Sequence, residues 1–420
     1  MNVLLIGNGG REHALAHAIT RSPRLGTLFV PRGNPGLAAL GREVALNIGT
    51  AEDVIGFCRD HAVDLVVVGP EAPLVAGLAD PLAAAGIAVF GPSKAAAALE
   101  GSKDFTKTIA QAAGVPTAAH ATFTDAAAAL AHVRDKGAPI VVKYDGLMAG
   151  KGVTVASTLA EAEAAIRALH ANEADARIVI EEMLVGEEAS LFCLVDGETV
   201  LPFGSAQDHK RAFDGDRGPN TGGMGAYSPA PVMTPAMERR ALDEIVIPTM
   251  REMVRRGTPY RGVIFAGLMI TAEGPKLIEY NCRFGDPECQ VLMLRLESDL
   301  LDLLEATARG SLAGHRVTLR PDAAVTIVLA SQGYPGEYAK GSEIRGVETA
   351  SAMPGVTIFH AGTRREGGRL LAAGGRVLNV SAVGADLAEA VSRAYAAVDA
   401  IDWPEGFCRR DIAARGLIAR

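Results

Sequence analysis

The sequence predicts a multidomain protein that combines α/β and α+β domains. The chain has 420 residues, and at roughly 150 residues per domain this length allows about three domains. Up to about Glu100, short β-branched runs alternate with amphipathic stretches, which is typical of an open parallel sheet with helices on both faces. Beyond Gly101 the pattern changes to α+β segments. We expect domains at residues 1–101, 102–315 and 320–420.

Composition excludes several classes of protein. Hydrophobic residues make up 49% of the chain, enough for several buried cores, and the formal charge of −8 argues against general nucleic-acid binding. The five cysteines form no CxxC pair and no zinc spacing, as is usual in a reducing cytosol. The first residues lack a basic leader, and charges and prolines interrupt the most apolar stretch, Val63–Phe90. We expect a cytoplasmic monomer without membrane or nucleic-acid partners.

The first domain is expected to bind a ligand at one edge of its sheet. The predicted strands are Val3–Ile6, Leu28–Val30, Leu65–Val68 and Ala88–Phe90, and the predicted helices are Glu12–Arg21, Ala51–His61, Leu74–Ala85 and Lys94–Leu99. Ligands of such sheets bind at the carboxyl ends of the strands. Three of these ends carry glycine- or proline-rich turns, Gly7–Glu12, Arg32–Gly36 and Gly69–Pro73.

The first of these turns does not have the dinucleotide-binding pattern. The third glycine of G-x-G-x-x-G falls at Glu12, and no acidic residue closes the second strand. NAD is therefore not expected. A glycine turn that opens a helix can still hold a single phosphate, although many such turns carry glycine for packing alone, and both interpretations stay open.

A compact segment at about residues 118–188 follows a helix that runs from Ser102 to about Ala113. Its predicted strands are Ala119–Phe123, Ile140–Tyr144, Val153–Ala156 and Ile178–Glu182, and its predicted helices are Asp125–Lys136 and Leu159–His170. The loop Asp145–Gly152 resembles a Walker A loop but is one residue short and leads into a strand. We interpret it as a lid over phosphates, with an ordinary hairpin turn as the alternative. Lys143 follows an apolar run and needs an anionic partner, either a triphosphate or a carboxylate.

The remaining chain supplies a long loop and a second set of strands. Strands Ala189–Val195 and Thr199–Leu201 lead into Phe203–Ala226, which we expect to be irregular and functional because it combines convergent charges with glycines. After it we expect a helix at Pro235–Arg256, strands at Gly262–Thr271 and Pro275–Tyr280, and helices at Cys289–Leu296 and Leu300–Arg309. The third domain is expected to contain strands Ala324–Ala330, Val356–His360, Arg369–Ala372 and Val377–Ala382 and the helix Asp386–Ala400.

The stretch Leu277–Glu288 is the strongest candidate for chemistry. Side chains alternate along a strand, so Glu279, Asn281 and Arg283 are expected to project together. The first two offer hard oxygen donors that suit Mg²⁺, and the third offers a planar cation that suits phosphate or carboxylate. A strand with a solvated polar face explains this triplet alone equally well.

Several motifs together resemble the glycinamide ribonucleotide synthetase (phosphoribosylamine–glycine ligase) family of the ATP-grasp superfamily. The most specific are Gln207–Arg211, Gly218–Tyr227 and Asn281–Glu288, and the resemblance covers nearly the whole chain. Departures are small: Tyr144 and Met148 stand where the family usually has alanine, and Cys289 where it often has threonine.

This resemblance implies a fold and a set of site residues. The central domain is expected to be an ATP-grasp module whose lid subdomain is the segment 118–188, with a small α+β domain after it. The ATP-binding residues are then Lys103, Lys143, Lys151, Glu181, Met183, Glu188, Lys210 and Asn220. The substrate-binding residues are Gly9, Arg11, Asn34, Gly36, Glu71, Asp208 and Asp286. Glu279 and Asn281 match the ligands of Mg²⁺ or Mn²⁺, and Arg283 and Lys143 are the expected catalytic residues.

The implied reaction joins glycine to 5-phosphoribosylamine at the expense of ATP, through glycyl phosphate, in purine biosynthesis. Many ATP-grasp enzymes carry a third, acidic metal ligand on the preceding strand, but Gly262–Ile270 contains no acid, so a smaller or water-completed metal set is expected. An ATP-grasp carboxylase or a formate-using transferase is the alternative enzyme, although either is expected to lack the Gln207–Tyr227 signature. A nucleotide sensor without turnover is the alternative outside enzymes.

Overall fold

The computed structural model describes residues 1–148 and 152–418 of the chain. Its first part is an open sheet in the order β3-β2-β1-β4-β5, with every neighbouring pair parallel, which confirms the predicted sheet. The strands are β1 (Asn2–Ile6), β2 (Thr27–Pro31), β3 (Arg42–Val44), β4 (Leu65–Val68) and β5 (Ala88–Phe90). The helices are α1 (Gly10–Ile19), α2 (Pro35–Ala38), α3 (Ala51–Asp60), α4 (Glu71–Ala76), α5 (Ala79–Ala84) and α6 (Lys94–Gly101).

Two details of this domain differ from the prediction. The single helix expected at Leu74–Ala85 is wrong: the structure has α4 and α5, because Gly77 ends α4 in the left-handed region at φ +97°. The short elements α2 and β3 were not predicted, because neither is long enough to show a periodic pattern.

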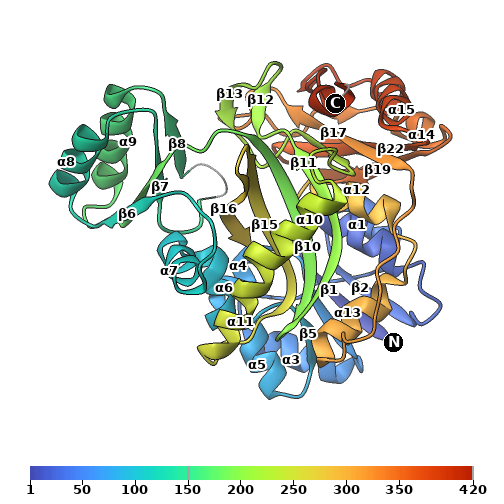
Figure 1. Cartoon of the computed structure of the whole chain (residues 1–420). Helices are drawn as coiled ribbons and strands as arrows, with labels where there is room; N and C mark the ends of the chain where they lie inside the picture. Colours follow the sequence, from blue (N-terminus) through green and yellow to red (C-terminus); the bar gives the residue numbers. More distant parts are fainter. Residues whose placement is uncertain (149–151, 419–420) are drawn as a thin grey trace.

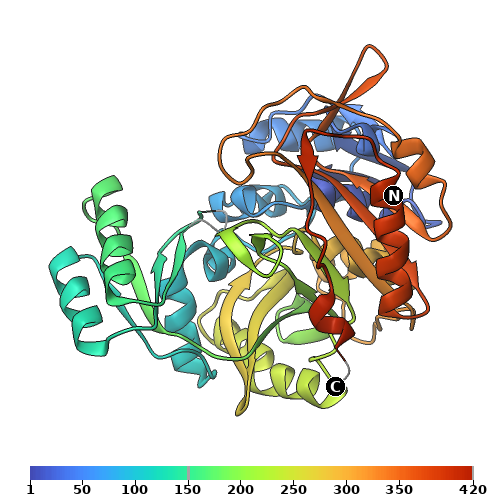
Figure 2. The ribbon, with the colours of Figure 1, turned by 90° about the horizontal axis from the view of Figure 1, so that it is seen from above.

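The lid stands apart from the rest of the molecule (Figure 1), and the view from above shows the same separation (Figure 2). It is an antiparallel sheet in the order β6-β9-β7-β8, reached through α7 (Lys103–Ala113). Its elements are β6 (His120–Phe123), α8 (Ala126–Lys136), β7 (Ile140–Tyr144), β8 (Val153–Ala156), α9 (Leu159–Asn172) and β9 (Ile178–Glu182). A separate hydrophobic core, which includes Val133, Val142 and Ile166, lies between this sheet and its helices.

A long antiparallel sheet runs through the central and C-terminal parts of the chain in the order β16-β15-β10-β11-β14-β17-β22-β19. Its strands are β10 (Glu187–Asp196), β11 (Thr199–Asp208), β14 (Gly225–Ser228), β15 (Arg261–Thr271), β16 (Gly274–Asn281), β17 (Ala323–Ser331), β19 (Val356–His360) and β22 (Arg376–Gly384), and β23 (Gly406–Phe407) pairs with β17. The pair β14–β17 joins the central strands to the C-terminal strands. The sheet therefore continues from one part of the chain into the other.

Helices and smaller strands surround this sheet. They are α10 (Pro235–Ala241), α11 (Ile247–Arg255), α12 (Glu288–Arg295), α13 (Leu300–Arg309), α14 (Val347–Ser351), α15 (Leu387–Asp399) and the sheet of β18 (Glu343–Ile344), β21 (Arg369–Ala372) and β20 (Thr363–Glu366). The helix predicted at Pro235–Arg256 contains a π-helical turn, Leu242–Val246. This turn lies just before Pro248, which has no N–H to donate and whose ring crowds the preceding turn.

The irregular loop expected at Phe203–Ala226 is wrong. Strand β11 continues to Asp208 because it pairs with β10 on one side and β14 on the other. The hairpin of β12 (Arg211–Phe213) and β13 (Arg217–Asn220) follows it. Gly204, Gly218 and Gly225 lie within strands β11, β13 and β14, so the density of glycines does not indicate an absence of strands here.

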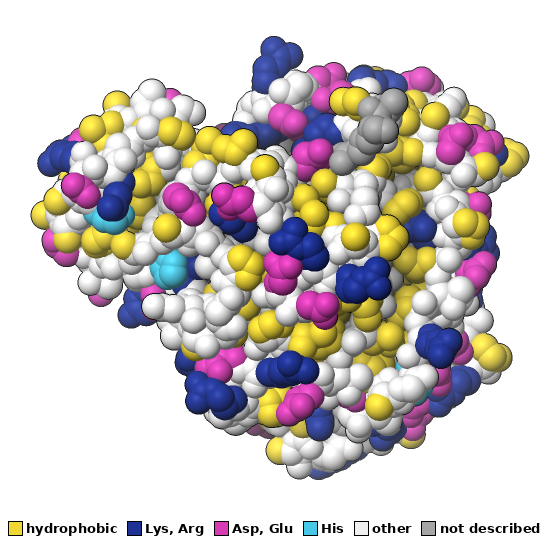
Figure 3. Space-filling model, viewed as in Figure 1, with side chains coloured by type: hydrophobic (Ala, Val, Ile, Leu, Met, Phe, Trp, Pro, Cys, Tyr) yellow, Lys and Arg dark blue, Asp and Glu magenta, His cyan; other side chains and the backbone are white. Residues whose placement is uncertain are grey.

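Two hydrophobic cores each draw residues from the first domain and from the central sheet. One contains Leu4 and Ile264, and the other contains Leu5 and Phe265. Glu71, which follows β4, pairs with Arg283, which follows β16, at 3.3 Å, so the carboxyl ends of these two strands lie close together. Within the described ranges, no helix is long and apolar enough to span a membrane. The visible surface carries acidic and basic side chains intermingled (Figure 3).

Candidate active site

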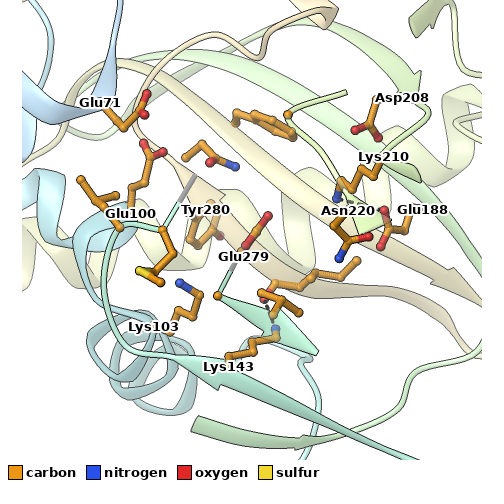
Figure 4. Close-up of a pocket in the computed structure, with 18 of the residues that line it drawn as sticks. Glu71, Glu100, Lys103, Lys143, Glu188, Asp208, Lys210, Asn220, Glu279 and Tyr280 are labelled. Carbon is orange, nitrogen blue, oxygen red and sulfur yellow. Dashed lines mark hydrogen bonds and ion pairs between the residues drawn. The ribbon is translucent and has the colours of Figure 1, made fainter. Parts of the chain in front are cut away.

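A cavity of about 520 Å³ lies where the lid, the first domain and the central sheet meet. Figure 4 shows Glu279 near its centre, with Lys103 and Lys143 on one side and Lys210, Asn220 and Glu188 on the other. The predicted site residues that line it are Arg11, Glu71, Lys103, Lys143, Glu181, Glu188, Asp208, Lys210, Asn220, Glu279, Asn281, Arg283 and Asp286. Lys151 lies outside the described residues.

Strand β16 places Glu279 in the cavity, beside residue Gly267 of β15, which has no side chain. Burial alone raises the pKa of this carboxyl, but the cations Lys210, Lys143, Lys103 and Arg283 outweigh burial, so the pKa lies below its usual value. Among the described residues, no hydrogen bond or ion pair reaches the Glu279 carboxylate. The charged carboxylate is therefore available to a ligand.

The residues present fit a divalent metal with few protein ligands. Glu279 and Asn281 both line the cavity, and Mg²⁺ often binds one or two side-chain oxygens while keeping water or phosphate at its other positions. Opposite Asn281, strand β15 carries Phe265. Within residues 1–148 and 152–418, no group of three or more His, Cys, Asp and Glu side chains is placed to hold a metal.

Arg283 is held between two carboxylates of the first domain. Its Nε lies 3.3 Å from Oε2 of Glu71, and its Nη2 lies 3.1 Å from Oε1 of Glu100. The other oxygen of Glu100 accepts a 2.7 Å hydrogen bond from the backbone N–H of Cys282. Burial lowers the pKa of Arg283, but Glu100 and Glu71 raise it by more. Glu100 was not predicted, because a single acid at the end of a helix carries no sequence signal.

The lysines on the lid side have partners of two kinds. The Lys103 ammonium donates to the carbonyl of Gly146 at 3.1 Å, while Asp145 accepts from the Lys103 backbone N–H at 2.6 Å. The Lys143 ammonium lies 2.8 Å from Glu181, and so the anionic partner that the sequence demanded is a carboxylate in this structure. Lys107, which the sequence analysis missed, contacts the same carboxylate at 3.1 Å.

On the opposite wall, the C-terminal segment (residues 409–415) contacts the strands next to Lys210 and Asn220. The Lys210 ammonium lies 2.9 Å from Glu188. Burial lowers the pKa of Lys210, but the carboxylates of Glu188 and Asp208 raise it by more, so the pKa lies above its usual value. Arg415 donates to the carbonyl of Asp208 at 2.9 Å. The contribution of residues so late in the chain was not predicted, because only the folded chain brings them here.

The buried Arg409 supports the same wall. It pairs with Asp216 at 2.9 Å and with Asp411 at 2.7 Å, and it donates to the carbonyl of Arg211 at 3.0 Å. These contacts attach the hairpin β12–β13, which ends at Asn220, to the C-terminal segment.

Asp286 lies at the boundary between the main cavity and a second cavity of about 450 Å³. Its carboxylate pairs with Arg376 of β22 at 3.1 Å and accepts from Gln290 at 2.8 Å. The second cavity also contains the predicted residue Gly9. Arg11 lies in the main cavity, buried against Glu12 at 2.6 Å.

Other predicted residues lie away from the lining of both cavities. The buried Asn34 donates to the carbonyls of Asn8 and His360, and its side-chain oxygen accepts from the N–H of Gly36 at the start of α2. Gly36 packs against a ring: a Cβ there would lie 2.0 Å from Cε1 of His13. Met183, which follows β9, is also absent from the residues that line the cavities. The ligand-binding roles of Asn34, Gly36 and Met183 stay predictions.

Comparisons with known proteins agree over the full chain. The family models described as the N domain, the ATP-grasp (A) domain and the C domain of phosphoribosylglycinamide synthetase match residues 1–100, 101–289 and 324–415. A phosphoribosylamine–glycine ligase of Mesorhizobium japonicum is 61% identical over 415 residues, covering 98% of this chain and 97% of that protein. The ligase of the same name from Vibrio cholerae is 51% identical over 424 residues, covering 99% of each.

Solved structures agree with these matches. The crystal structure of phosphoribosylamine–glycine ligase from Thermotoga maritima has a TM-score of 0.85 and 31% identity, covering 98% of this chain and 100% of that one. The biotin carboxylase domain of Hydrogenobacter thermophilus 2-oxoglutarate carboxylase has a TM-score of 0.73 at 15% identity, covering 97% and 91%, and at that identity the likeness concerns the fold alone. From the matches of its three segments and its full-length relatives, the chain belongs to the phosphoribosylglycinamide synthetase family.

Proposed function

We propose that this protein is an ATP-dependent ligase that joins glycine to 5-phosphoribosylamine, giving glycinamide ribonucleotide, ADP and phosphate in purine biosynthesis. Relatives that are 51–61% identical carry the name of this enzyme. The structural observation that carries the proposal is the Glu279 carboxylate, which has no hydrogen bond or ion pair from the described residues and faces Lys210, Lys143, Lys103 and Arg283 in one cavity. A metal with a polyphosphate satisfies both the carboxylate and the cations.

The chemistry has two displacements. A carboxylate oxygen of glycine attacks the γ-phosphorus of ATP, and the bond from that phosphorus to the bridging oxygen breaks, so ADP leaves and glycyl phosphate remains. The ribosylamine nitrogen then attacks the carbonyl carbon of glycyl phosphate, loses a proton, and expels inorganic phosphate. Both steps depend on positioning and charge neutralisation more than on a dedicated base.

Residues of this chain take distinct parts in these steps. We assign ATP binding to Lys103, Lys143, Glu188, Lys210 and Asn220, because they face one another across the cavity. Arg283 supplies positive charge to the phosphate that is transferred, held in place by Glu71 and Glu100. Lys151, Glu181 and Met183 complete the proposed nucleotide set, as the family resemblance implies.

The metal and the second substrate are assigned by chemistry. Mg²⁺ or Mn²⁺ at Glu279 and Asn281 would supply further positive charge to the phosphates. The ribosylamine is proposed to lie between the main and second cavities, near Gly9, Arg11, Glu71, Asp208 and Asp286, with Asn34 and Gly36 shaping the neighbouring loop. We further propose a cytoplasmic monomer with three domains at 1–101, 102–315 and 320–420, on the composition and pattern of the sequence.

The direct test is ADP release in the presence of glycine, Mg²⁺ and freshly generated phosphoribosylamine. Omission of any one of the three is expected to abolish turnover above the background of ATP hydrolysis. Turnover that is indifferent to glycine would refute the proposal, and turnover with bicarbonate or formate in its place would favour the alternative ATP-grasp enzymes. Binding of ATP without turnover under all these conditions would favour the nucleotide sensor.

A further inference from the structure

A cluster of three buried, charged side chains lies in the cavity at the base of the lid. The Lys107 ammonium lies 3.1 Å from Oε2 of Glu181, and the Lys143 ammonium lies 2.8 Å from Oε1. The three side chains are only 2%, 4% and 5% exposed for Lys107, Glu181 and Lys143. Two cations thus share one carboxylate, and the cluster carries one net positive charge toward the cavity.

Lys107 belongs to a different part of the chain from its two partners. Glu181 and Lys143 are on lid strands β9 and β7, whereas Lys107 is on α7, before the lid begins. The Lys107 ammonium also donates to Oγ1 of Thr117 at 2.7 Å, and that hydroxyl donates to the carbonyl of Leu277 at 2.7 Å. Leu277 precedes Glu279 by two residues on β16. The contacts of Lys107 therefore connect the lid strands to the strand that carries the proposed metal ligands.

The shared carboxylate decides what Lys143 can do. With Lys107 present, Glu181 divides its charge between two ammonium groups, and the Lys143 ammonium keeps positive charge for a ligand. Without Lys107, the pair of Glu181 and Lys143 would be neutral and would attract a polyanion much less. Burial lowers the pKa of Lys107, Glu181 raises it, and Lys143 lowers it again. The resulting pKa is about 8. Lys107 is therefore still mostly charged at neutral pH.

We infer that Lys107 is a positioning residue for nucleotide binding, and that it acts through Glu181 to keep the Lys143 ammonium available to the phosphates. The inference rests on the proposed function, in that the ligand is taken to be a nucleoside triphosphate. It adds a role for a residue whose ion-pair and hydrogen-bond side-chain partners among the described residues are Glu181 and Thr117, neither of them a proposed metal ligand or an expected catalytic residue.

The test measures binding of ATP and of adenosine by titration calorimetry, without glycine or ribosylamine. Lys107→Met is expected to weaken ATP binding roughly ten- to hundredfold, the usual loss for one charge-assisted contact. Adenosine has no phosphates, so its affinity is expected to stay within about twofold. Lys107→Arg keeps the charge and is expected to restore most of the ATP affinity. The control Lys136→Met removes an exposed lysine of the lid and is expected to bind ATP as the wild type does.

A second comparison tests the route through Glu181. In a Glu181→Gln background the carboxylate is gone, so the further change Lys107→Met is expected to alter the dissociation constant for ATP by less than about threefold. The double variant loses one cation and one anion together, so the buried cluster keeps its net charge and the test stays usable when Lys107→Met alone does not fold. A loss of tenfold or more in that background would overturn the inference.

Two other results would overturn it: unchanged ATP binding by Lys107→Met, or an equal loss of ATP and adenosine binding. Either of these leaves the proposed ligase intact, provided that the wild type binds ATP and turns over. Failure of the wild-type protein to bind ATP at all would refute the proposed function itself, so the two failures are distinguishable.

Discussion

Replacing Glu279 by glutamine removes a negative charge from the centre of the cavity while keeping the size of the side chain. Because no hydrogen bond or ion pair from the described residues reaches this carboxylate, the fold loses no such contact. The expected shift in melting temperature is less than about 3 °C for a chain of this size. Loss of one preorganised electrostatic contact raises the reaction barrier by about 3–4 kcal/mol, so kcat is expected to fall several hundredfold.

The assay pairs ADP release at saturating glycine, ribosylamine and Mg²⁺ with a thermal melt of the same preparation. Glu273→Gln is the matched control, since Glu273 lies at the turn before the same strand, where it pairs with Lys276 at 2.8 Å. The control is expected to keep wild-type activity. A kcat within about tenfold of the wild type, or a loss of activity that follows a large loss of stability, would refute the assignment of Glu279 as a metal ligand.

Three further predictions concern packing, pH and the C-terminal segment. Gly36→Ala places a Cβ 2.0 Å from the His13 ring and is expected to lower the free energy of unfolding by about 1–3 kcal/mol, measured by urea unfolding; wild-type stability would contradict it. Burial and the neighbouring His360 lower the pKa of His13 to about 3, and burial lowers that of His360 to about 4. Because the unfolded chain binds these protons at a higher pH than the folded chain, stability is expected to be full above about pH 6.5 and to fall toward pH 4. His13→Gln removes one of the two groups, so the wild type is expected to lose more stability than the variant between about pH 7.5 and about pH 5. An equal change in urea midpoint for both proteins would contradict this. Arg409→Met removes the buried partner of Asp216 and Asp411. It is expected to lower the free energy of unfolding by about 1–3 kcal/mol and to weaken ATP binding, measured by thermal melts and calorimetry; unchanged ATP affinity would show that these contacts do not support the site.

Local patterns in the sequence predicted much of the fold. The β-branched run of β4 is buried along its whole length, and such runs identified the strands of the first sheet. The family was also identified from the chain itself, and the comparisons confirm it. Prediction failed at Gly77, whose helix break depends on one backbone angle, and along Phe203–Ala226, because a high glycine content does not distinguish strands from irregular loops.

Supporting residues of the site were missed for a different reason. Glu100, Lys107, Arg376 and Arg409 contact site residues that are distant in sequence, as in the pairs Glu100–Arg283 and Arg376–Asp286. A charged residue on a helix or strand normally faces solvent, and nothing in its neighbours reveals that it is buried against an opposite charge. Motifs identify residues that face the ligand, while the residues that hold them in place become visible only in the folded chain.

These supporting contacts explain how an acidic protein offers a site for a polyanion. Among the described residues that line the main cavity, acidic and basic side chains are equal in number. Two of the cations expected at phosphates are already paired with a carboxylate, Lys210 with Glu188 and Lys143 with Glu181. Each carboxylate fixes the direction of its cation and offsets the cost of burying it. A nucleotide therefore meets donors that are already oriented, and its affinity reflects the difference between the pairs that it forms and those that it displaces. Since Glu279, like Asp208, has no hydrogen bond or ion pair from the described residues, an incoming metal can bind its carboxylate without breaking an existing pair.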